Sequence, residues 1–593
     1  MSHIKKFHIS IEHIIFSYVI LVGILFTFFV PPFQKPDEVV HFYRTVALSR
    51  GQVVCQQHDG ASSFTFPKYI YELPIRLSGD IKFDYNKKFP QNAFSQNDLQ
   101  TDIREYVWKD WCGLSFIGYI PNVVGFIMGN ITGNILVSFY LGRLTGFLFF
   151  LISLWFARKY VSEHFKPIVY VTACIPMLLH QVSGFTYDEV QISMMVILFS
   201  LFTHFFETKI ITKKLVAIFV SSLLILVLVK SGYYPLLGLL LLIPYKKIQG
   251  YSPKYLLVLF FTSLIAMIIG IRITSNYGQS AFSNFANPQI QSLLILTHPF
   301  YFIQAIINAI DKNADFWIQS FIGKFGWLDY QLNGFIYLLY ICITGVILYK
   351  STISKASVQL NKYQLGILFL SIFGTVLLIF TGMYLIATPV AEDIVQGVQG
   401  RYFIVLFPFF LFFLNQIYLK LKQKKLMPYV YVVCMLIFVF HISQAIYGRY
   451  FDYSKGISNP NVLDERLQSI RKEPNSLAVV SVSKTIRFQM PVDMDKKLAG
   501  FQVLTIGSSS AKVLVPYEFV LYNQSCTEQK ANGFFKQSDL QVTGKYSQLF
   551  RPFRSDEPEV CVSISPFVED NLKNYLLLGV YKKSILIEPL YLF

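Results

Sequence analysis

Long apolar segments separated by polar connections fill the first three quarters of the chain. The hydrocarbon core of a bilayer takes roughly 20 apolar residues of helix, and eleven segments approach this length. They are Ile14–Val30, Asn134–Phe156, Pro167–Gln181, Val190–Phe206, Leu215–Val229, Tyr234–Pro244, Tyr255–Ile271, Gly334–Leu348, Leu365–Ile386, Tyr402–Leu419 and Pro428–Ile446. Tyr234–Pro244 is the shortest and needs its flanks to cross a bilayer. The pattern predicts a polytopic α-helical membrane protein with about eleven transmembrane helices.

The pattern changes after about residue 450. Short alternating or β-branched runs follow there, with Gly, Ser, Asn and Pro between them: Leu477–Ser483, Phe501–Ile506, Lys512–Tyr522, Glu559–Ser565 and Leu576–Ile587. Such spacing predicts a small all-β domain of the sandwich type. We therefore expect a transmembrane domain over residues 1–450 and a β-rich domain over residues 451–593. The transmembrane domain includes a long first loop at 31–133 and a second long loop over about Thr274–Asn333.

The composition supports a membrane protein and raises a question about charge. Of the 593 residues, 53% are hydrophobic and only 15% are charged. These values exclude a single large soluble globule, a disordered chain and a small disulfide-rich domain. The net charge is +17, from 52 Lys and Arg against 35 Asp and Glu. Binding to nucleic acid is one explanation of such a balance.

The positions of the basic residues favour a different explanation. Lys5 and Lys6 precede the first apolar segment, and no small-residue cleavage site follows it, which indicates an uncleaved signal anchor with a cytoplasmic N-terminus. The five later connections on the same side all carry basic residues: Arg158, Lys159 and Lys166; Lys209, Lys213 and Lys214; Lys246, Lys247 and Lys254; Lys350, Lys355 and Lys362; Lys420, Lys422, Lys424 and Lys425. This is the positive-inside bias of membrane proteins. It makes nucleic acid an unnecessary partner and, after eleven spans, places the C-terminal domain outside.

The seven cysteines are consistent with this topology. Cys174, Cys342 and Cys434 fall in predicted spans, where they serve as small apolar residues. The other four fall in the two outer segments, as the pairs Cys55 with Cys112 and Cys526 with Cys561. Because an oxidising exterior permits disulfides, we expect a bridge within each pair.

An acidic motif directly follows the first span. Pro31-Pro-Phe-Gln-Lys-Pro-Asp-Glu-Val-Val-His-Phe-Tyr-Arg44 reads as a turn and then a helix over Asp37–Arg50. In such a helix Asp37, His41 and Arg44 share one face, and Arg44 would keep Asp37 ionised. Asp37 or Glu38 could act as a general base. The alternative is that the two acids only favour a helix N-terminus and that His41 is an exposed polar residue.

Further polar residues recur at the same predicted level of the membrane. They are Tyr187, Asp188, Lys230, Lys324, Trp327, Asp329, Gln399, Arg401 and Tyr402. Ionisable residues at a membrane edge are functional candidates, and several on one side predict a cavity open to the exterior. Arg401, Lys230 and Lys324 suit a phosphate group, whereas Arg143 suits either a phosphate or a packing role. No His/Asp cluster indicates a metal, and the cofactor requirement is left open.

Several of these strings resemble a known family. Pro31–Arg44, Ser183–Asp188, Lys230–Pro235, Gly326–Asp329 and above all Gly397-Val-Gln-Gly-Arg-Tyr-Phe403 are similar to the motifs of a bacterial multipass membrane family of unknown function, which is placed in the GT-C glycosyltransferase superfamily. The resemblance covers roughly residues 15–450. It implies a GT-C-like glycosyltransferase that takes a sugar from a polyprenyl-phosphate carrier at the outer face of the membrane. An acidic residue in the first outer loop is the usual base in that superfamily, and this position falls on Asp37 or Glu38.

Together, the residues and the resemblance predict an enzyme of the bacterial cytoplasmic membrane that transfers a sugar to a cell-surface glycan. Asp37, with Glu38 as its rival, would deprotonate the acceptor, and His41, Arg44, Lys230 and Arg401 would bind the donor phosphate. Tyr187, Trp327 and Tyr402 could stack on sugar rings. Two alternatives stay open. One is a glycan polymerase or ligase that uses a polyprenyl-diphosphate-linked donor. The other is a flippase or transporter, which should carry ionisable residues near the bilayer midplane and show repeated halves.

Overall fold

A computed structural model describes most of the helical part of the chain and the strands of the C-terminal part. The described residues are 11–58, 61–78, 81, 88–89, 93–95, 102–109, 115–250, parts of 252–268, 286–353, 359–417, 428–452 and, with gaps, 478–591. Lys5, Lys6, Cys112 and most of Tyr255–Ile271 lie outside these ranges. The chain forms two compact units. The first contains Met1–Ser280, Asp315–Ile379 and Gln399–Ser458, and the second contains Ala281–Ala314, Phe380–Val398 and Asn459–Phe593.

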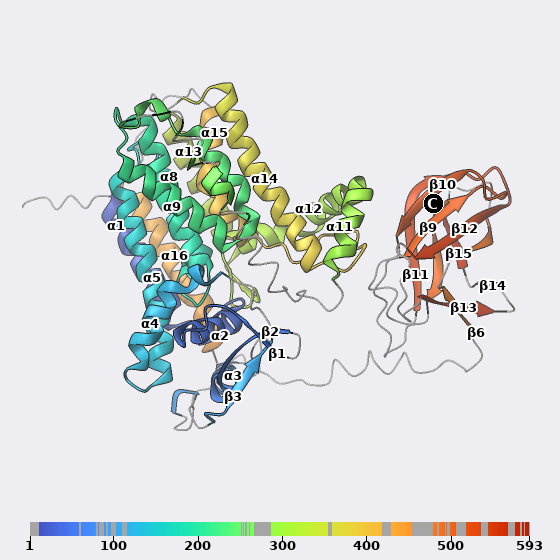
Figure 1. Ribbon diagram of the computed structural model, residues 1–593, viewed down its shortest axis with the longest axis horizontal. Helices are drawn as coiled ribbons and strands as arrows, with labels where there is room; N and C mark the ends of the chain where they lie inside the picture. The colour runs from blue at the N-terminus through green and yellow to red at the C-terminus, as the bar shows by residue number, and fades with distance from the viewer. Residues whose placement is uncertain are drawn as a thin grey trace, which may run out of the picture. The chain divides into compact units, whose positions relative to one another are not determined.

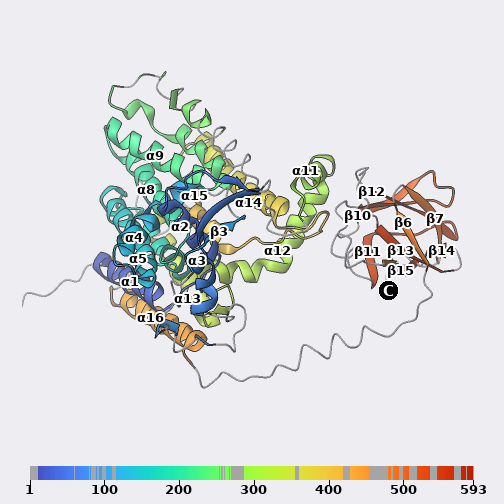
Figure 2. The same cartoon turned by 60° about the horizontal axis from the view of Figure 1, so that its bottom comes forward.

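The first unit is a helical bundle (Figure 1). Its helices are α1 (Ile11–Phe28), α2 (Glu38–Ser49), α3 (Lys68–Ser78), α4 (Ile120–Asn130), α5 (Ile135–Tyr160), α6 (Lys166–Ala173), α7 (Pro176–Val182), α8 (Asp188–Glu207), α9 (Lys213–Val229), α13 (Gly334–Ile353), α15 (Phe407–Ile417) and α16 (Pro428–Tyr450). Its described residues also include parts of α12 (Pro299–Ile322) and α14 (Lys362–Ile386) and the 3-10 helices η1 (Ala93–Ser95), η2 (Phe116–Tyr119), η3 (Ser231–Leu242), η4 (Tyr245–Lys247) and η5 (Gly400–Leu406). Figure 2 shows α4 and α5 side by side as a helical hairpin. One continuous apolar core joins α1, α5 to α9, α13, α15 and α16.

Two small sheets accompany the bundle. The strands β1 (Gln56–His58), β2 (Ala61–Pro67) and β3 (Glu105–Trp108) form an antiparallel sheet in the order β1-β2-β3, which packs against α2 through an aromatic cluster that includes Tyr43 and Phe66. A short hairpin of β4 (Lys324–Phe325) and β5 (Tyr330–Gln331) precedes α13. The α2 helix and the three-stranded sheet belong to the long predicted loop at 31–133. The described parts of this segment therefore have regular secondary structure.

Five helices in the described part of the chain are long and apolar enough to cross a membrane: α1, α5, α8, α14 (Lys362–Ile386) and the Val432–Tyr450 portion of α16. The pair α11 (Pro288–Thr297) and α12 (Pro299–Ile322) passes the same test together and is bent by 107° between the two helices. The protein is thus a mostly helical membrane protein with five to six candidate spans among its described residues. The count of eleven stays a prediction.

The remaining apolar runs differ from uninterrupted spans for local reasons. Pro167–Gln181 is divided into α6 and α7, because Pro176 has no N–H to continue the first helix. Tyr234–Pro244 forms part of the 3-10 helix η3, and Tyr402–Leu419 is divided between η5 and α15. The second long segment predicted between spans, Thr274–Asn333, contains α11 and α12, and its location outside the membrane stays a prediction. Charged residues within α12, such as Asp311 and Lys312, interrupt the apolar pattern there.

The C-terminal part of the second unit consists of two antiparallel sheets. One has the order β10-β9-β12-β7, from β7 (Ile486–Pro491), β9 (Tyr517–Tyr522), β10 (Gln529–Phe534) and β12 (Glu559–Pro566). The other contains β6 (Ala478–Val482), β8 (Leu498–Thr505), β11 (Gly544–Phe553), β13 (Leu576–Tyr581), β14 (Ser584–Ile585) and β15 (Ile587–Tyr591). Alternate residues of β9 are buried, and Phe519 meets Phe501 of the other sheet edge to face, with ring centres 5.0 Å apart. The predicted β-rich region is confirmed as a two-sheet arrangement.

The cysteine predictions can now be compared with the structure. Cys526 and Cys561 form a disulfide that ties the turn after β9 to β12, as predicted. Cys55 is also disulfide-bonded, whereas its predicted partner Cys112 lies outside the described residues. Cys174, Cys342 and Cys434 are free thiols, as the sequence predicts for cysteines in apolar segments.

Candidate functional site

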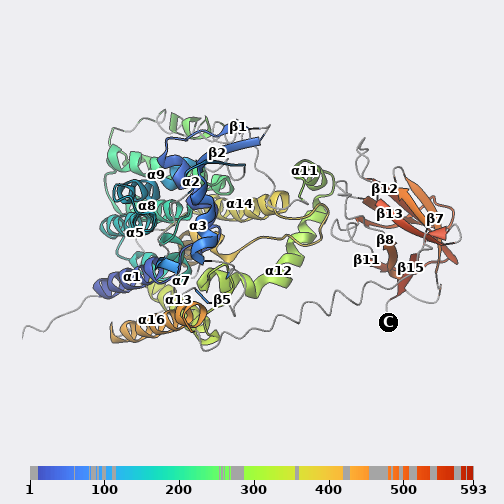
Figure 3. The same cartoon turned by 90° about the horizontal axis from the view of Figure 1, so that it is seen from below.

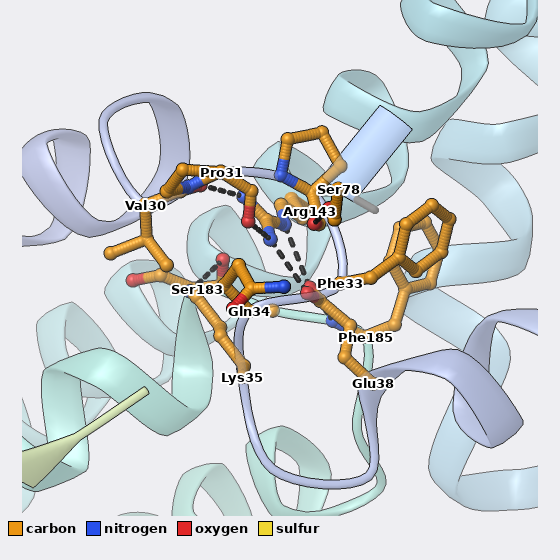
Figure 4. A network of polar contacts seen from close by, with 12 residues as sticks. Val30, Pro31, Phe33, Gln34, Lys35, Glu38, Ser78, Arg143, Ser183 and Phe185 are labelled. Carbon is orange, nitrogen blue, oxygen red and sulfur yellow. Dashed lines mark hydrogen bonds and ion pairs between the residues drawn. The ribbon is translucent and has the colours of Figure 1, made fainter. Parts of the chain in front are cut away.

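A buried arginine fixes the chain where α1 ends and the acidic motif begins. Arg143 of α5 donates through Nη1 to the carbonyl oxygens of Thr27 (3.0 Å) and Val30 (2.7 Å) and through Nη2 to that of Pro31 (3.0 Å). These carbonyls include groups at the C-terminus of a helix, which have no intrahelical partner and attract cations. Figure 4 shows the guanidinium at the centre of this network. Of the two roles the sequence left open for Arg143, the contacts match the packing role.

The same arginine holds Glu38. Its Nε and Nη2 donate to the two carboxylate oxygens of Glu38 at 2.7 and 2.6 Å, and neither side chain has any exposed surface. The backbone N–H of Phe185 donates to Glu38 as well, at 3.2 Å. The carboxylate is therefore enclosed and fully engaged. A buried, paired carboxylate of this kind positions the chain, and between the two acids the structure favours Asp37 for contact with a substrate.

Asp37 occupies a constrained and partly open position. It precedes the first residue of α2 with φ 61° and ψ 6°, the left-handed conformation that Asp tolerates better than most residues. Its side chain is 33% exposed, and its Oδ2 accepts a hydrogen bond of 2.9 Å from Nη2 of Arg401. The predicted helix Asp37–Arg50 thus begins one residue later, at Glu38, and ends at Ser49.

The partner of Asp37 differs from the one we predicted. Arg44 does not hold Asp37: it donates to the carbonyl oxygens of Gln52 and Val53 at 3.0 and 2.8 Å and closes the turn after α2. The helix-face argument did not include these nearby carbonyl oxygens, and the role of Arg44 at a phosphate stays an untested prediction. Arg401, which lies 364 residues away in sequence, takes the place beside Asp37.

Arg401 is held in a fixed orientation by three side chains. Besides Asp37, it donates from Nε to Oε1 of Gln399 (2.6 Å) and from Nη1 to Oε1 of Gln181 (3.2 Å). Only 4% of its side chain is exposed. A guanidinium fixed in this way presents a planar set of donors to an oxyanion.

A second cation lies close to the first. The Nζ of Lys230 is 4.0 Å from the centre of the Tyr402 ring and 5.4 Å from that of Tyr187, and the guanidinium carbon of Arg401 is 5.5 Å from the Tyr402 ring. Tyr187 immediately precedes Asp188, the first residue of α8. The predicted residues Asp37, His41, Tyr187, Asp188, Lys230, Gln399, Arg401 and Tyr402 therefore gather in one place, here called the acid–base cluster.

His41 lies at the buried side of the acid–base cluster. Its Nδ1 is 2.7 Å from the hydroxyl of Tyr119, and its ring meets the ring of Tyr187 edge on at 5.0 Å. Burial lowers the pKa of His41 from 6.5 to about 4, against the opposing effect of Asp37 and Asp188. The imidazole is neutral at pH 7 and adds no positive charge for the phosphate that the sequence led us to expect there.

Sequence reasoning missed three residues of this region. Gln181 contacts Arg401, Tyr119 contacts His41, and Tyr233 donates its hydroxyl proton to the carbonyl oxygen of Tyr402 at 2.7 Å. Gln181 and Tyr233 lie within polar strings that end predicted spans, which is a signal that could have included them. Tyr119 has no such signal, because it belongs to η2, whose sequence is apolar and aromatic and contains no charged residue.

The β4–β5 hairpin holds the other three predicted residues. Asp329 accepts two hydrogen bonds at its Oδ2 from Arg449 of α16, at 2.9 and 2.6 Å. Trp327 donates from its indole N–H to the carbonyl oxygen of Phe33 at 3.0 Å, and Lys324 is 3.4 Å from Oε1 of Gln319. Trp327 therefore contacts the loop that leads to Asp37, whereas Asp329 ties the hairpin to α16.

Comparison with known families agrees with the membrane architecture. A family described as "Predicted membrane protein (DUF2142)" matches residues 20–411, more than half of the chain. The chain belongs to this family. The matched region begins within α1 and includes the acidic motif and Arg401, and therefore all of the acid–base cluster. A search of curated proteins finds no match.

One glycine of the Gly397-Val-Gln-Gly-Arg string is explained by close packing within this family region. Gly400 donates its N–H to Oγ of Ser320 at 2.8 Å, and a Cβ atom at this position would lie 1.9 Å from the carbonyl oxygen of Trp317. Because both neighbours belong to α12, η5 can lie directly on that helix only if residue 400 has no side chain. This contact sets the position of Arg401, the next residue.

Gly400→Ala is therefore expected to destabilise the protein by about 1–3 kcal/mol, the usual cost of an overpacked core, and to weaken the Arg401 contacts. Gly366→Ala in α14 is the matched control, since a Cβ there meets nothing within 4 Å, and it should be neutral or slightly stabilising. Thermal unfolding of the two purified variants in one detergent gives the comparison. Equal unfolding temperatures would contradict the packing argument.

The histidine of the cluster predicts a pH dependence. Because the pKa of His41 is about 4 in the folded protein and about 6.5 in the unfolded chain, only the unfolded chain takes up a proton between these values. Stability should therefore fall as the pH is lowered from 6.5 to 4, by up to about 3 kcal/mol from this residue. Unfolding of wild type and His41→Asn between pH 7 and pH 5 tests this. The variant should lose less stability, whereas equal losses would assign the acid sensitivity to other groups.

Among the described residues, no group of three or more His, Cys, Asp or Glu side chains is arranged to hold a metal ion. The cofactor requirement stays open, as it was after the sequence analysis. The chemistry derived below uses only the side chains of the acid–base cluster.

Proposed function

We propose that this protein is an integral-membrane glycosyltransferase of the GT-C type, which transfers a sugar from a polyprenyl-phosphate carrier to a cell-surface glycan. The observation that carries the proposal is the pairing of Asp37 with Arg401 at 2.9 Å, with Lys230 close by. A partly exposed carboxylate can accept a proton, and two adjacent cations can hold a phosphate. The resemblance of the motif strings to GT-C enzymes supports the same reaction.

The reaction would use these groups as follows. The donor phosphate replaces Asp37 as the partner of Arg401, which leaves the Asp37 carboxylate available to the acceptor. Asp37 takes the proton of an acceptor hydroxyl, whose oxygen attacks the anomeric carbon and forms the new glycosidic bond. The bond between that carbon and the phosphate oxygen breaks, and the phosphate leaves with the electron pair. Because the acceptor oxygen attacks from the opposite face, the anomeric centre is inverted. Arg401 and Lys230 stabilise the charge that develops on the phosphate.

The proposed topology includes eleven spans with the N-terminus in the cytoplasm of a bacterial cell. The basic connections support this orientation, and it places the acid–base cluster and the β-rich part at the extracytoplasmic face. Sugars carried by a polyprenyl phosphate reach glycan acceptors at that face. An alkaline phosphatase fused after Phe593 should be active in expressing cells.

Surface glycans provide the direct test of the function. We expect mass spectrometry of cells that lack the protein, or that carry only Asp37→Asn, to show the loss of one hexose-type residue from a surface glycan. Wild-type protein should restore that residue. Unchanged glycans in both strains would contradict the proposal.

The nearest alternative is a glycan polymerase or ligase with a diphosphate-linked donor. The presence of two cations, Lys230 and Arg401, close to one tyrosine ring is the observation that favours it, because a diphosphate carries more charge than a phosphate diester. The same glycan experiment separates the two. Loss of one residue supports the transferase, whereas shortened chains of unchanged composition support the polymerase.

Arg401 should determine donor affinity. Arg401→Lys keeps the charge but loses the planar pair of donors, so binding of a polyprenyl phosphate in detergent is expected to weaken by about tenfold or more. Arg401→Gln should bind still less. Lys324→Gln is a control, because its ammonium contacts Gln319 and Phe316. If both Arg401 variants bind normally, Arg401 is structural and Lys230 becomes the leading phosphate ligand.

A further inference from the structure

A second site of a different kind lies between four helices of the first unit. A cavity of about 250 Å³, open on one side, is lined by residues of α1, α6, α13 and α16. Apolar and thiol side chains form most of its wall, among them Ile15, Cys174, Ile343, Cys434 and Phe438. The hydroxyls of its three tyrosines all have partners: Tyr18 donates to the carbonyl oxygen of Cys174, Tyr340 to that of Val171, and Tyr170 to the carboxylate of Glu12. The cavity therefore offers an apolar ligand a surface with few unpaired polar atoms.

This cavity is separate from the acid–base cluster. It is lined by residues between Ile11 and Tyr18, in the first half of α1. The segment whose carbonyl oxygens bind Arg143 follows the other end of that helix. At 1.5 Å per helical residue, Tyr18 and Phe28, the last residue of α1, are about 15 Å apart along the helix axis. A ligand whose phosphate is held by Arg401 has its charged group at the other end of α1.

The helices around the cavity border the bilayer. The candidate spans in α1 and α16 have only 39% and 22% of their residues buried inside the protein, so most of their surface is left for lipid. Figures 1 and 3 show these two helices side by side. An apolar cavity stays dry in water and takes up apolar ligands, and between membrane-spanning helices the apolar molecules at hand are lipid chains.

Charged residues form a rim at one end of the cavity. Glu12 accepts hydrogen bonds from Arg158 (2.6 Å), Lys166 (3.0 Å) and Tyr170 (3.0 Å), and Lys166 also pairs with Glu163 at 2.6 Å. The rim thus has two acids and two bases, with no net charge. Glu163 and Arg158 are its accessible members, with 81% and 43% of their side chains exposed. Such a rim complements a headgroup that carries one charge of each sign.

We propose that the cavity binds an acyl chain of a zwitterionic glycerophospholipid of the phosphoethanolamine class. The phosphate of the headgroup would lie at Arg158 and Lys166, and its ammonium at Glu163. The bound lipid would join α1 and α16, which otherwise leave the cavity between them. This is a structural lipid in the leaflet at the N-terminal end of α1, and it is not the sugar donor. The proposal does not depend on the proposed transferase activity.

Native mass spectrometry of the full-length protein tests the site with a matched pair of variants. Wild type, extracted in a mild detergent, should retain one phosphatidylethanolamine. Ile343→Phe fills the cavity and should lose it. Ile341→Phe adds the same ring on the same helix at an exposed position (50% exposed) that does not line the cavity, and it should retain the lipid. Equal retention of the lipid by the two variants would overturn the proposal. Preferential retention of phosphatidylglycerol by the wild type would overturn the assignment of the headgroup.

The native cysteines give a second measurement that needs no substitution. Cys174 and Cys434 line the cavity, whereas Cys342 is exposed and does not. In delipidated protein, added phosphatidylethanolamine should slow maleimide labelling of Cys174 and Cys434 by about tenfold at saturation and leave Cys342 unchanged. If all three thiols respond alike, the cavity does not bind the lipid. Because neither experiment measures sugar transfer, the outcomes of both experiments are independent of the proposed function.

Discussion

Asp37→Asn is expected to reduce sugar transfer by a factor of about 100 to 10,000, the usual cost of losing a general base, while the protein still inserts and folds. The substitution preserves the shape of the side chain, and Asn also tolerates the left-handed conformation at φ 61°. It removes the negative charge beside Arg401 and, with it, the ability to take the acceptor proton. Single-turnover transfer from a synthetic polyprenyl-phosphate sugar measures the step directly, because product release does not limit it.

Asp188→Asn is the control for Asp37→Asn within the same cluster. It also removes one negative charge near Lys230 and Arg401, and a purely electrostatic effect would therefore appear in both variants. Wild-type transfer by Asp37→Asn would exclude Asp37 as the base. Asp188 would then be the first residue to test, ahead of Asp329, which Arg449 already engages, and Asp393, which lies in the second unit.

Glu38→Gln is expected to lower the free energy of unfolding by about 3–5 kcal/mol, because it leaves the guanidinium of Arg143 buried without its counter-ion. The folded fraction should still transfer sugar, since Glu38 has no exposed surface. Chemical unfolding in detergent, followed by intrinsic fluorescence, gives the loss of stability. Transfer per folded molecule gives the second quantity, and the two together distinguish a positioning residue from a base.

The double variant Glu38→Met with Arg143→Met makes the structural prediction sharper. Replacing a buried ion pair by apolar side chains of similar size is often neutral or stabilising. Here the loss of Arg143 also removes the donors to the carbonyl oxygens of Thr27, Val30 and Pro31. We therefore expect the double variant to remain destabilised. Full recovery of the free energy of unfolding would show that Arg143 stabilises the protein only through the ion pair and not through its hydrogen bonds to the end of α1.

The sequence predicted those features that depend on local composition. Apolar runs such as Ile14–Val30 and Leu365–Ile386 became α1 and α14, because burial of backbone polar groups in a bilayer requires helices. The alternation of side chains in β9 matches the two faces of a strand in a sheet. The bridge between Cys526 and Cys561 followed from an even pair in one predicted domain. The α11–α12 pair was missed, since charges within α12 interrupt the apolar pattern.

The candidate site was only partly accessible from sequence. The residue types were found, because charged and aromatic side chains at the ends of apolar runs are conspicuous. Their pairing could not be predicted, because Asp37 and Arg401 are 364 positions apart in sequence and Glu38 and Arg143 are 105 positions apart. The helix-face argument assigned Arg44 to Asp37, whereas free carbonyls nearby bind Arg44 instead.

What the sequence by itself determined is therefore a membrane protein with a β-rich C-terminal part and an acidic motif after its first apolar segment. Only the tertiary structure decided which acid of that motif is enclosed and which is open to a ligand. The physical reason is that adjacent acids have nearly the same local propensities. Their different environments come from Arg143 of α5 and Arg401 of η5, two guanidinium groups that the fold brings to adjacent residues of one turn.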